Sequence, residues 1–62
     1  MTPEDIPAIE ALLGITWDDS NTSAEQAHED SGWALVEVFA SGGSSLGVVV
    51  RMSAGADWAR VE

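Results

Sequence analysis

The sequence predicts a small α+β domain, in which a three-stranded antiparallel β-sheet carries one short N-terminal helix on one face and is joined by a second short acidic helix or loop. Two observations predict this class. Apolar residues recur at helical spacing near the N-terminus, and two strand-like runs joined by glycine and serine occupy the second half of the chain. A chain of 62 residues has room for one thin core, so residues 1–62 are predicted to form a single domain.

Residues 5–13 are typical of a short amphipathic helix. Asp5 can cap its N-terminus, and a proline at position 7 is tolerated only in the first turn, where its missing N–H is not needed. Pro3 offers an alternative start, but the proline at position 7 would then lie inside the helix, so we expect one turn over residues 3–5 before the helix restarts. Gly14 is a favourable residue for a left-handed C-terminal stop. The apolar side chains on one face of this helix are Ile6, Ile9, Leu12 and Leu13.

Residues 18–31 form a polar, acidic segment that begins with a loop at 18–21. Two overlapping Ser/Thr-x-x-Glu/Gln patterns, which are typical of helix N-termini, start at Thr22 and Ser23. Good helix formers follow, although they provide almost no apolar face. We expect a short, exposed helix that ends at Gly32.

Residues 33–40 and 46–53 are strand patterns joined by a five-residue loop of Ser and Gly, which predicts a β-hairpin. Pairing Ala40 with Leu46 sorts the side chains of the two strands into two faces. The first face is wholly apolar and contains Ala34, Val36, Val38, Ala40, Leu46, Val48, Val50 and Met52. The second face is mixed and contains Trp33, Leu35, Glu37, Phe39, Gly47, Val49, Arg51 and Ser53.

Residues 57–62 favour a third strand, with Ala59 and Val61 on the apolar face and Trp58 on the mixed face. The helix at 5–13 can cover only one face, so the mixed face would expose aromatic side chains. An exposed apolar patch on a small domain is typical of a dimer or partner site, and Trp is frequent among interface hot spots. The predicted contact face contains Trp33, Phe39 and Trp58.

The charge is unevenly distributed along the chain, whose net charge is −9. Residues 1–31 contain eight carboxylates and neither Lys nor Arg, whereas the second half contains three carboxylates and two Arg. Such a field costs stability through self-repulsion, so it serves either solubility or a basic partner. Its sign disfavours direct binding to nucleic acids or to anionic membranes. The carboxylates predicted to meet a partner are Asp18, Asp19, Glu25, Glu29 and Asp30.

The sequence offers no convergent set of catalytic or metal-binding residues. Cys is absent, and the single His, His28, lies in a polar segment where a buried Ser-His-Asp arrangement is not expected. The spacing from Asp18 to Glu29 matches a calcium-binding EF-hand loop, but the sixth position, which requires Gly, is Ser23. Glycines 42 and 43 lack the Lys and the helix that follow a phosphate-binding loop. We therefore expect a non-enzymatic protein without a metal site or a cofactor.

The composition predicts a cytoplasmic protein. There is no Cys, no apolar stretch near the ~20 residues that span a bilayer, and no basic region followed by an apolar run at the N-terminus. The abundance of Ala, Gly and Val, together with the lack of Lys and Tyr, is typical of a GC-rich bacterial or phage genome.

In size, charge and lack of catalytic groups, the chain resembles small phage-encoded inhibitors of the DNA-mimic type, such as anti-CRISPR and anti-restriction proteins. The acidic run from Asp18-Asp19 to Glu29-Asp30 carries this resemblance. It implies a mode of action rather than a fold: the carboxylates would occupy the basic nucleic-acid-binding surface of a target protein, such as a CRISPR effector, in the cytoplasm of a bacterial host. The alternative hypothesis is a small structural or assembly module that forms homodimers or docks through Trp33, Phe39 and Trp58.

Overall fold

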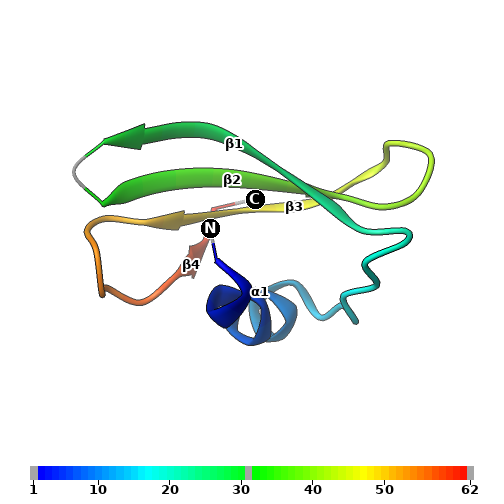
Figure 1. Cartoon of the computed structure of the whole chain (residues 1–62), viewed down its shortest axis with the longest axis horizontal. Helices are drawn as coiled ribbons and strands as arrows, with labels where there is room; N and C mark the ends of the chain where they lie inside the picture. The colour runs from blue at the N-terminus through cyan, green and yellow to red at the C-terminus, as the bar shows by residue number, and fades with distance from the viewer. Residues whose placement is uncertain (1, 31, 62) are drawn as a thin grey trace.

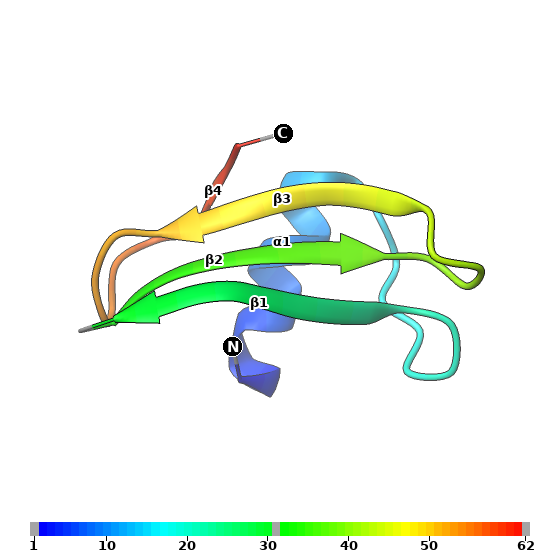
Figure 2. The same cartoon turned by 90° about the horizontal axis from the view of Figure 1, so that it is seen from above.

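The computed structural model describes residues 2–30 and 32–61. A 3-10 turn (Pro3–Asp5) leads into α1 (Ile6–Leu13), and four strands follow: β1 (Ser23–Asp30), β2 (Trp33–Phe39), β3 (Ser45–Arg51) and β4 (Ala59–Arg60). The strands form one open antiparallel sheet in the order β1-β2-β3-β4, with α1 against one of its faces (Figure 1; Figure 2 shows the sheet in front of the helix). The α+β class is confirmed, but the sheet has four strands rather than three.

The first helix agrees with the sequence prediction. Residues 3–5 make a separate 3-10 turn before α1, and the helix ends at Gly14 in the left-handed conformation (φ 67°, ψ 35°). Ile9 and Leu13 are buried, and Leu12 packs against them from the side. The predicted apolar stripe is therefore the face that α1 turns towards the sheet.

The predicted second helix is wrong, because residues 23–30 form the edge strand β1. Every side chain of this strand is exposed, so no apolar face was available to stabilise a helix by packing. Pairing with β2 instead satisfies backbone groups along the edge of that strand. The sequence signal for this hairpin is the Ser31-Gly32 pair between the two strands, since Ser-Gly marks a tight turn.

The register between β2 and β3 differs from the predicted one by a single residue. Val36 lies opposite Val49, and a shift in pairing leaves Leu46 as the extra residue of a β-bulge. A one-residue slip turns the strand over, so Val49 is fully buried and Met52, predicted to lie in the core, is 68% exposed. Because residues 48–50 are three consecutive valines, β3 presents apolar side chains to the core in either register. The hydrophobic pattern therefore could not distinguish the two registers.

The predicted third strand is the fourth strand of the sheet and is shorter than expected. β4 pairs with β3 through Val49–Arg60 and Val50–Ala59. Trp58 is buried in the core instead of lying on the mixed face, and Ala59 and Val61 are exposed. Burying the largest side chain of the segment removes more apolar area from water than burying Ala59 would.

The core lies between α1 and the sheet, with the helix against β3 and β4. Its buried members are Ile9, Leu13, Ala34, Val36, Val38, Val49 and Trp58. Leu12, Ile15, Trp17 and Leu46 pack around this cluster. No residue of β1 belongs to it, and the strand joins the rest of the sheet through its pairing with β2.

Arg51 connects the helix, the core and the turn between β1 and β2. Its guanidinium group lies 3.8 Å from the Asp5 carboxylate and 4.9 Å from the ring centroid of Trp58. Its Nε atom donates a hydrogen bond to the carbonyl of Gly32 at 3.2 Å. The prediction that Arg51 shares a face with Glu37 is wrong, because the register of β3 turns Arg51 towards the helix.

The side chain of Asp5 binds the backbone that precedes α1 and does not cap the helix. Its backbone is helical (φ −82°, ψ −17°), and its carboxylate accepts a hydrogen bond from the backbone N–H of Thr2 at 2.9 Å. That bond is the main reason why the pKa of Asp5 lies below its ordinary value; burial opposes it, and the Trp58 indole, the Thr2 hydroxyl and Arg51 add to it. The indole N–H is buried without a hydrogen bond of standard geometry among the described residues, but its dipole still favours the carboxylate.

Substitution of Val49 by Ala tests the register. It removes a fully buried side chain and should lower the free energy of unfolding by roughly 2–3 kcal/mol, from lost burial plus a residual cavity. Val48→Ala is the matched control, because Val48 is half-buried on the other face and should cost less than about 1 kcal/mol. Urea unfolding followed by circular dichroism measures both values. A larger cost for Val48→Ala would contradict the register.

Asp5→Asn tests the link between the first turn and the sheet. A lowered carboxyl pKa stabilises the fold above the ordinary value near 3.8, and this contribution is lost as the pH falls through the lower folded value. Asp5→Asn should therefore cost about 1 kcal/mol at neutral pH, and the gap to the wild type should narrow as the pH falls below the ordinary carboxyl pKa of 3.8. Glu4→Gln removes a charge from the same turn and serves as the control in unfolding experiments across this pH range. A gap that does not change with pH would contradict this role of Asp5.

Candidate functional site

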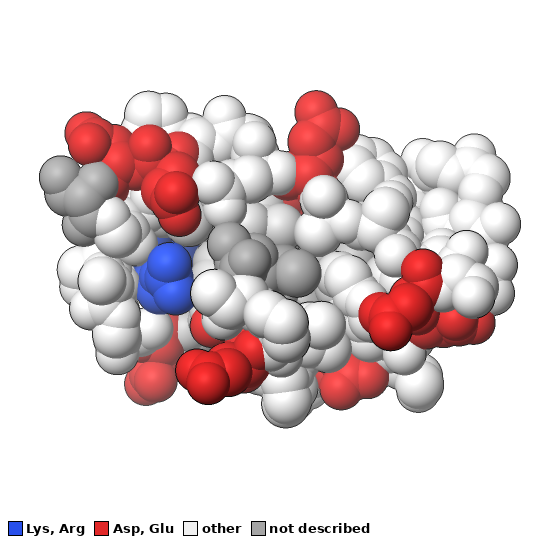
Figure 3. Space-filling model, viewed as in Figure 1, with Lys and Arg blue, Asp and Glu red and all other residues white. Residues whose placement is uncertain are grey.

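The five carboxylates predicted to meet a partner line one margin of the sheet and are all exposed. Asp18 and Asp19 lie in the turn before β1, and Glu25, Glu29 and Asp30 lie on the strand itself. A strand rises about 3.3 Å per residue, so the set extends over more than about 20 Å. Figure 3 shows acidic side chains in separate patches across one side of the molecule. The predicted acidic segment is therefore a linear margin rather than a compact cluster.

Glu25 and Glu29 do not share a face, as a helix would have required. Glu25 lies opposite Glu37, whereas Glu29 lies opposite the buried Ala34. A register shift between Gln26 and His28 causes this change of side. The bulge thus directs carboxylates to both faces of β1.

Asp18 has a local structural role in the turn that leads into β1. Its carboxylate accepts hydrogen bonds from the side chain of Asn21 at 2.7 Å and from the backbone N–H of Ser20 at 2.9 Å. These bonds, the first of them most strongly, lower the pKa of Asp18. The group is therefore an ionised turn-former, and Asp19 beside it is an exposed carboxylate at the same end of β1.

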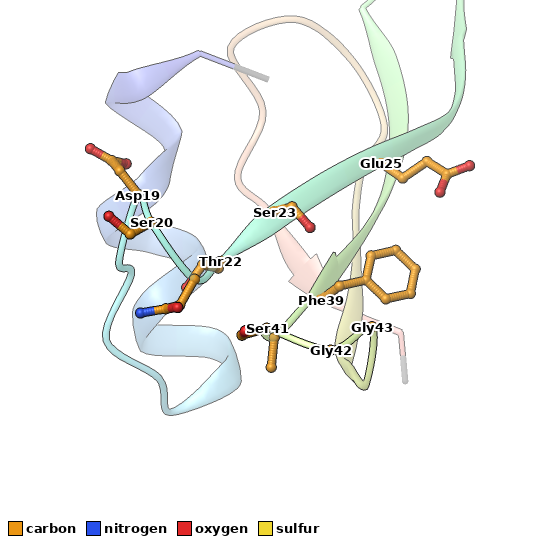
Figure 4. Close-up of a pocket in the computed structure, with 11 residues that line it drawn as sticks. Asp19, Ser20, Thr22, Ser23, Glu25, Phe39, Ser41, Gly42 and Gly43 are labelled. Atoms are coloured by element: carbon orange, nitrogen blue, oxygen red, sulfur yellow. The ribbon is translucent and has the colours of Figure 1, made fainter.

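An open groove with a volume of about 510 Å³ lies between the turn at 19–22 and the hairpin turn at 40–43 (Figure 4). Hydroxyl groups and glycine backbone form most of its wall, and Phe39 supplies a ring. Figure 4 shows the side chains of Asp19 and Glu25 at opposite ends of the groove, pointing away from each other. The carboxylates of the groove therefore do not converge on one point.

The sheet face turned away from α1 carries a second group of candidate residues, which we call the open face. Its apolar members come from β2 and β3 and are half-buried: Trp33, Leu35, Phe39, Val48 and Val50. None of them is among the side chains that form or surround the core. Of the predicted contact face, Trp33 and Phe39 lie on this side of the sheet, whereas Trp58 is buried in the core.

Two carboxylates lie among the apolar side chains of the open face. Glu25 and Glu37 are direct neighbours across the β1–β2 pairing, and like charges in this position destabilise a sheet. Ser45 donates a hydrogen bond from its hydroxyl to the Glu37 carboxylate at 2.8 Å. Neither arginine of the described residues shares this face in the register, because Arg51 and Arg60 lie on the helix side.

One end of the open face is formed by His28 and Trp33. Their rings meet edge to face with centroids 4.6 Å apart, and the Trp33 indole N–H points at the sulfur of Met52 at 3.1 Å. His28, expected on an exposed helix, is thus an exposed strand residue. Its ring and Met52 extend the apolar surface beyond β2.

Over residues 2–30 and 32–61, no group of three or more His, Asp or Glu side chains is placed to hold a metal ion. In the same part of the chain, no helix has the length and apolar character needed to cross a membrane.

Gly32 positions the acidic strand, and its substitution tests this arrangement. Its φ is +85°, and a Cβ atom there would lie 2.3 Å from the backbone nitrogen of Ala54. Gly32→Ala should therefore cost roughly 2–4 kcal/mol, from left-handed strain and from the clash. Gly42→Ala is the matched control, because its φ is +90° and nothing lies within 4 Å of the new atom. It should cost about 1–2 kcal/mol in the same thermal unfolding experiment. Equal costs would contradict the close approach at Gly32.

Comparison of the chain with protein-family models, with curated proteins and with solved structures finds no match. Two surfaces make up the candidate site, and both are defined by the structure of this chain alone. They are the acidic margin, formed by Asp18, Asp19, Glu25, Glu29 and Asp30, and the open face beside it.

Proposed function

We propose that this chain is a non-enzymatic binding protein whose acidic margin occupies a basic, nucleic-acid-binding surface of a target protein, such as a CRISPR effector. The acidic margin would compete with the nucleic acid and so inhibit the target. The observation that carries the proposal is the segregation of charge across the sheet.

The strand order supports this proposal because it separates the acidic margin from both arginines. β1 is at one edge of the sheet, Arg51 is on β3, and Arg60 is on β4 at the opposite edge. With about 4.8 Å between strands, the backbones of the two arginines lie roughly 10 and 14 Å from the backbone of β1. Arg51 is further engaged by Asp5 on the helix side. The negative field of the margin is therefore directed outwards.

The position of β1 also gives a partner access to the charges. All eight of its residues are exposed, and the bulge presents Glu25 on one face and Glu29 on the other. A basic groove that receives the edge of the sheet can contact both faces at once. The attraction between opposite potentials steers the association of the two proteins, and added salt weakens this attraction.

A second candidate function, a structural or assembly module, is favoured by the open face. Five apolar side chains there lack a covering element among the described residues. A domain of this size gains from covering such a face with a second copy or another protein. In this case the acidic margin would provide only solubility.

Affinity capture from a bacterial lysate tests the proposed function. The immobilised protein should retain nucleic-acid-binding proteins at low salt, and duplex DNA or added salt should displace them. Glu25→Gln combined with Glu29→Gln should weaken the affinity for a retained protein by roughly three- to thirtyfold.

The control variant combines Glu4→Gln with Asp57→Asn, which removes the same charge from exposed positions outside the acidic margin. It should retain most of the binding. Capture that resists both DNA and salt, or that is equally weakened by the control variant, would contradict the proposal.

A further inference from the structure

We propose that the open face is a docking surface for an amphipathic helix of a partner protein, with Lys or Arg beside the apolar stripe of that helix. This inference deepens the proposed function in one respect, because it takes the partner to be basic. It differs in the surface used, which is the face of β2 and β3 rather than the margin along β1.

The first step is the division of the sheet into two unlike faces. The face towards α1 is closed, with Ala34, Val36 and Val49 completely buried. Apart from Glu37, the alternate residues of β2 are apolar as well, as are Val48 and Val50 of β3, but they remain half-exposed. A strand that is apolar on both faces is typical of a sheet covered on both sides. Figure 2 looks onto the side that has no cover.

The second step concerns the shape of the occupant. The sheet already packs α1, an amphipathic helix of eight residues, against its other face. Helices on both faces of a sheet make a common layered architecture, and a helix lays one apolar stripe on the pleated surface. A partner helix on the open face would complete this three-layer arrangement.

The third step excludes a second copy of this chain as the occupant of the open face, because of the charge of the chain. A two-fold symmetric dimer through the open face would bring Glu25 and Glu37 of both copies together, on chains that each carry −9. Neither copy could offer a Lys or Arg side chain there, because the chain has no Lys and the register places Arg51 and Arg60 on the helix side. A partner with Lys or Arg can approach the same two carboxylates favourably.

The probe for this inference is a synthetic helix of roughly 18 residues, with Leu at i, i+3, i+4 and i+7 spacing and Lys elsewhere. Three control peptides accompany it: a scrambled sequence without the apolar stripe, a version with Glu in place of Lys, and a version with Gln in place of Leu. Binding is followed by the backbone amide and Trp indole signals in ¹⁵N-labelled wild-type protein.

The expected result is that the Leu/Lys helix shifts the signals of β2, β3 and the Trp33 indole, whereas the scrambled and Glu-containing peptides do not. Val48→Thr with Val50→Thr should lower the affinity for the Leu/Lys helix by about tenfold. Thr keeps the shape and strand preference of Val but loses apolar contact. Ala11→Ser is the control, since Ala11 is exposed on α1 and lies outside the open face. It should leave the affinity unchanged.

Four outcomes would overturn the inference. The first is no binding of the Leu/Lys helix, and the second is equal binding of the Glu version. The third is a dimer of the free protein, seen by sedimentation equilibrium, that Val48→Thr with Val50→Thr abolishes. Signal shifts confined to β1 and the turn at 18–22, produced equally by the Gln/Lys peptide, would also overturn it while supporting the acidic margin. Displacement by DNA in lysate capture tests the proposed function independently of these results.

Discussion

The chain has one helix of eight residues to cover a sheet of four strands, and this shortage of cover is the constraint on which the rest of the structure depends. α1 lies against β3 and β4, so the core forms there around Ile9, Val49 and Trp58. β1 lies beyond the reach of the helix and carries only exposed side chains. The face opposite the helix stays open for the same reason. Both candidate surfaces are thus parts of the sheet that the helix does not cover.

Electrostatics follows the same division between covered and uncovered parts. Arg51 lies on the side of the sheet that α1 covers. There it contacts Asp5, the ring of Trp58 and the carbonyl of Gly32. This position ties the first turn of the chain to the turn that carries the acidic strand. It also leaves the opposed carboxylates Glu25 and Glu37 without an Arg or Lys on the open face of the described sheet. The apolar and acidic features of the uncovered side therefore complement a basic, amphipathic surface.

The two proposed surfaces are adjacent and share Glu25, so one partner could contact both. A basic groove that receives the acidic margin would meet β1 from the side, and a helix next to that groove would lie on β2 and β3. In such a complex the charges would direct the approach and the apolar residues would supply most of the buried area. The proposed DNA-mimic mode would account for the contact at the acidic margin alone, whereas the open face would add an apolar contact that has no counterpart in DNA.

The sequence by itself determined the elements whose signals are local. The spacing of Ile9 and Leu13, the stop at Gly14 and the hairpin of two Val-rich strands were all predictable, because helical periodicity and turn chemistry act over a few residues. It also determined the set of acidic residues and the pairing of Trp33 with Phe39 on one face. Tertiary structure alone decided three features: the strand state of residues 23–30, the burial of Trp58 and the side of the sheet that each valine at 48–50 faces. Each of these features depends on which segments of the chain pair or pack with one another. A segment without an apolar face pairs with a vacant sheet edge, and a single bulge at Leu46 reverses every later side chain of its strand.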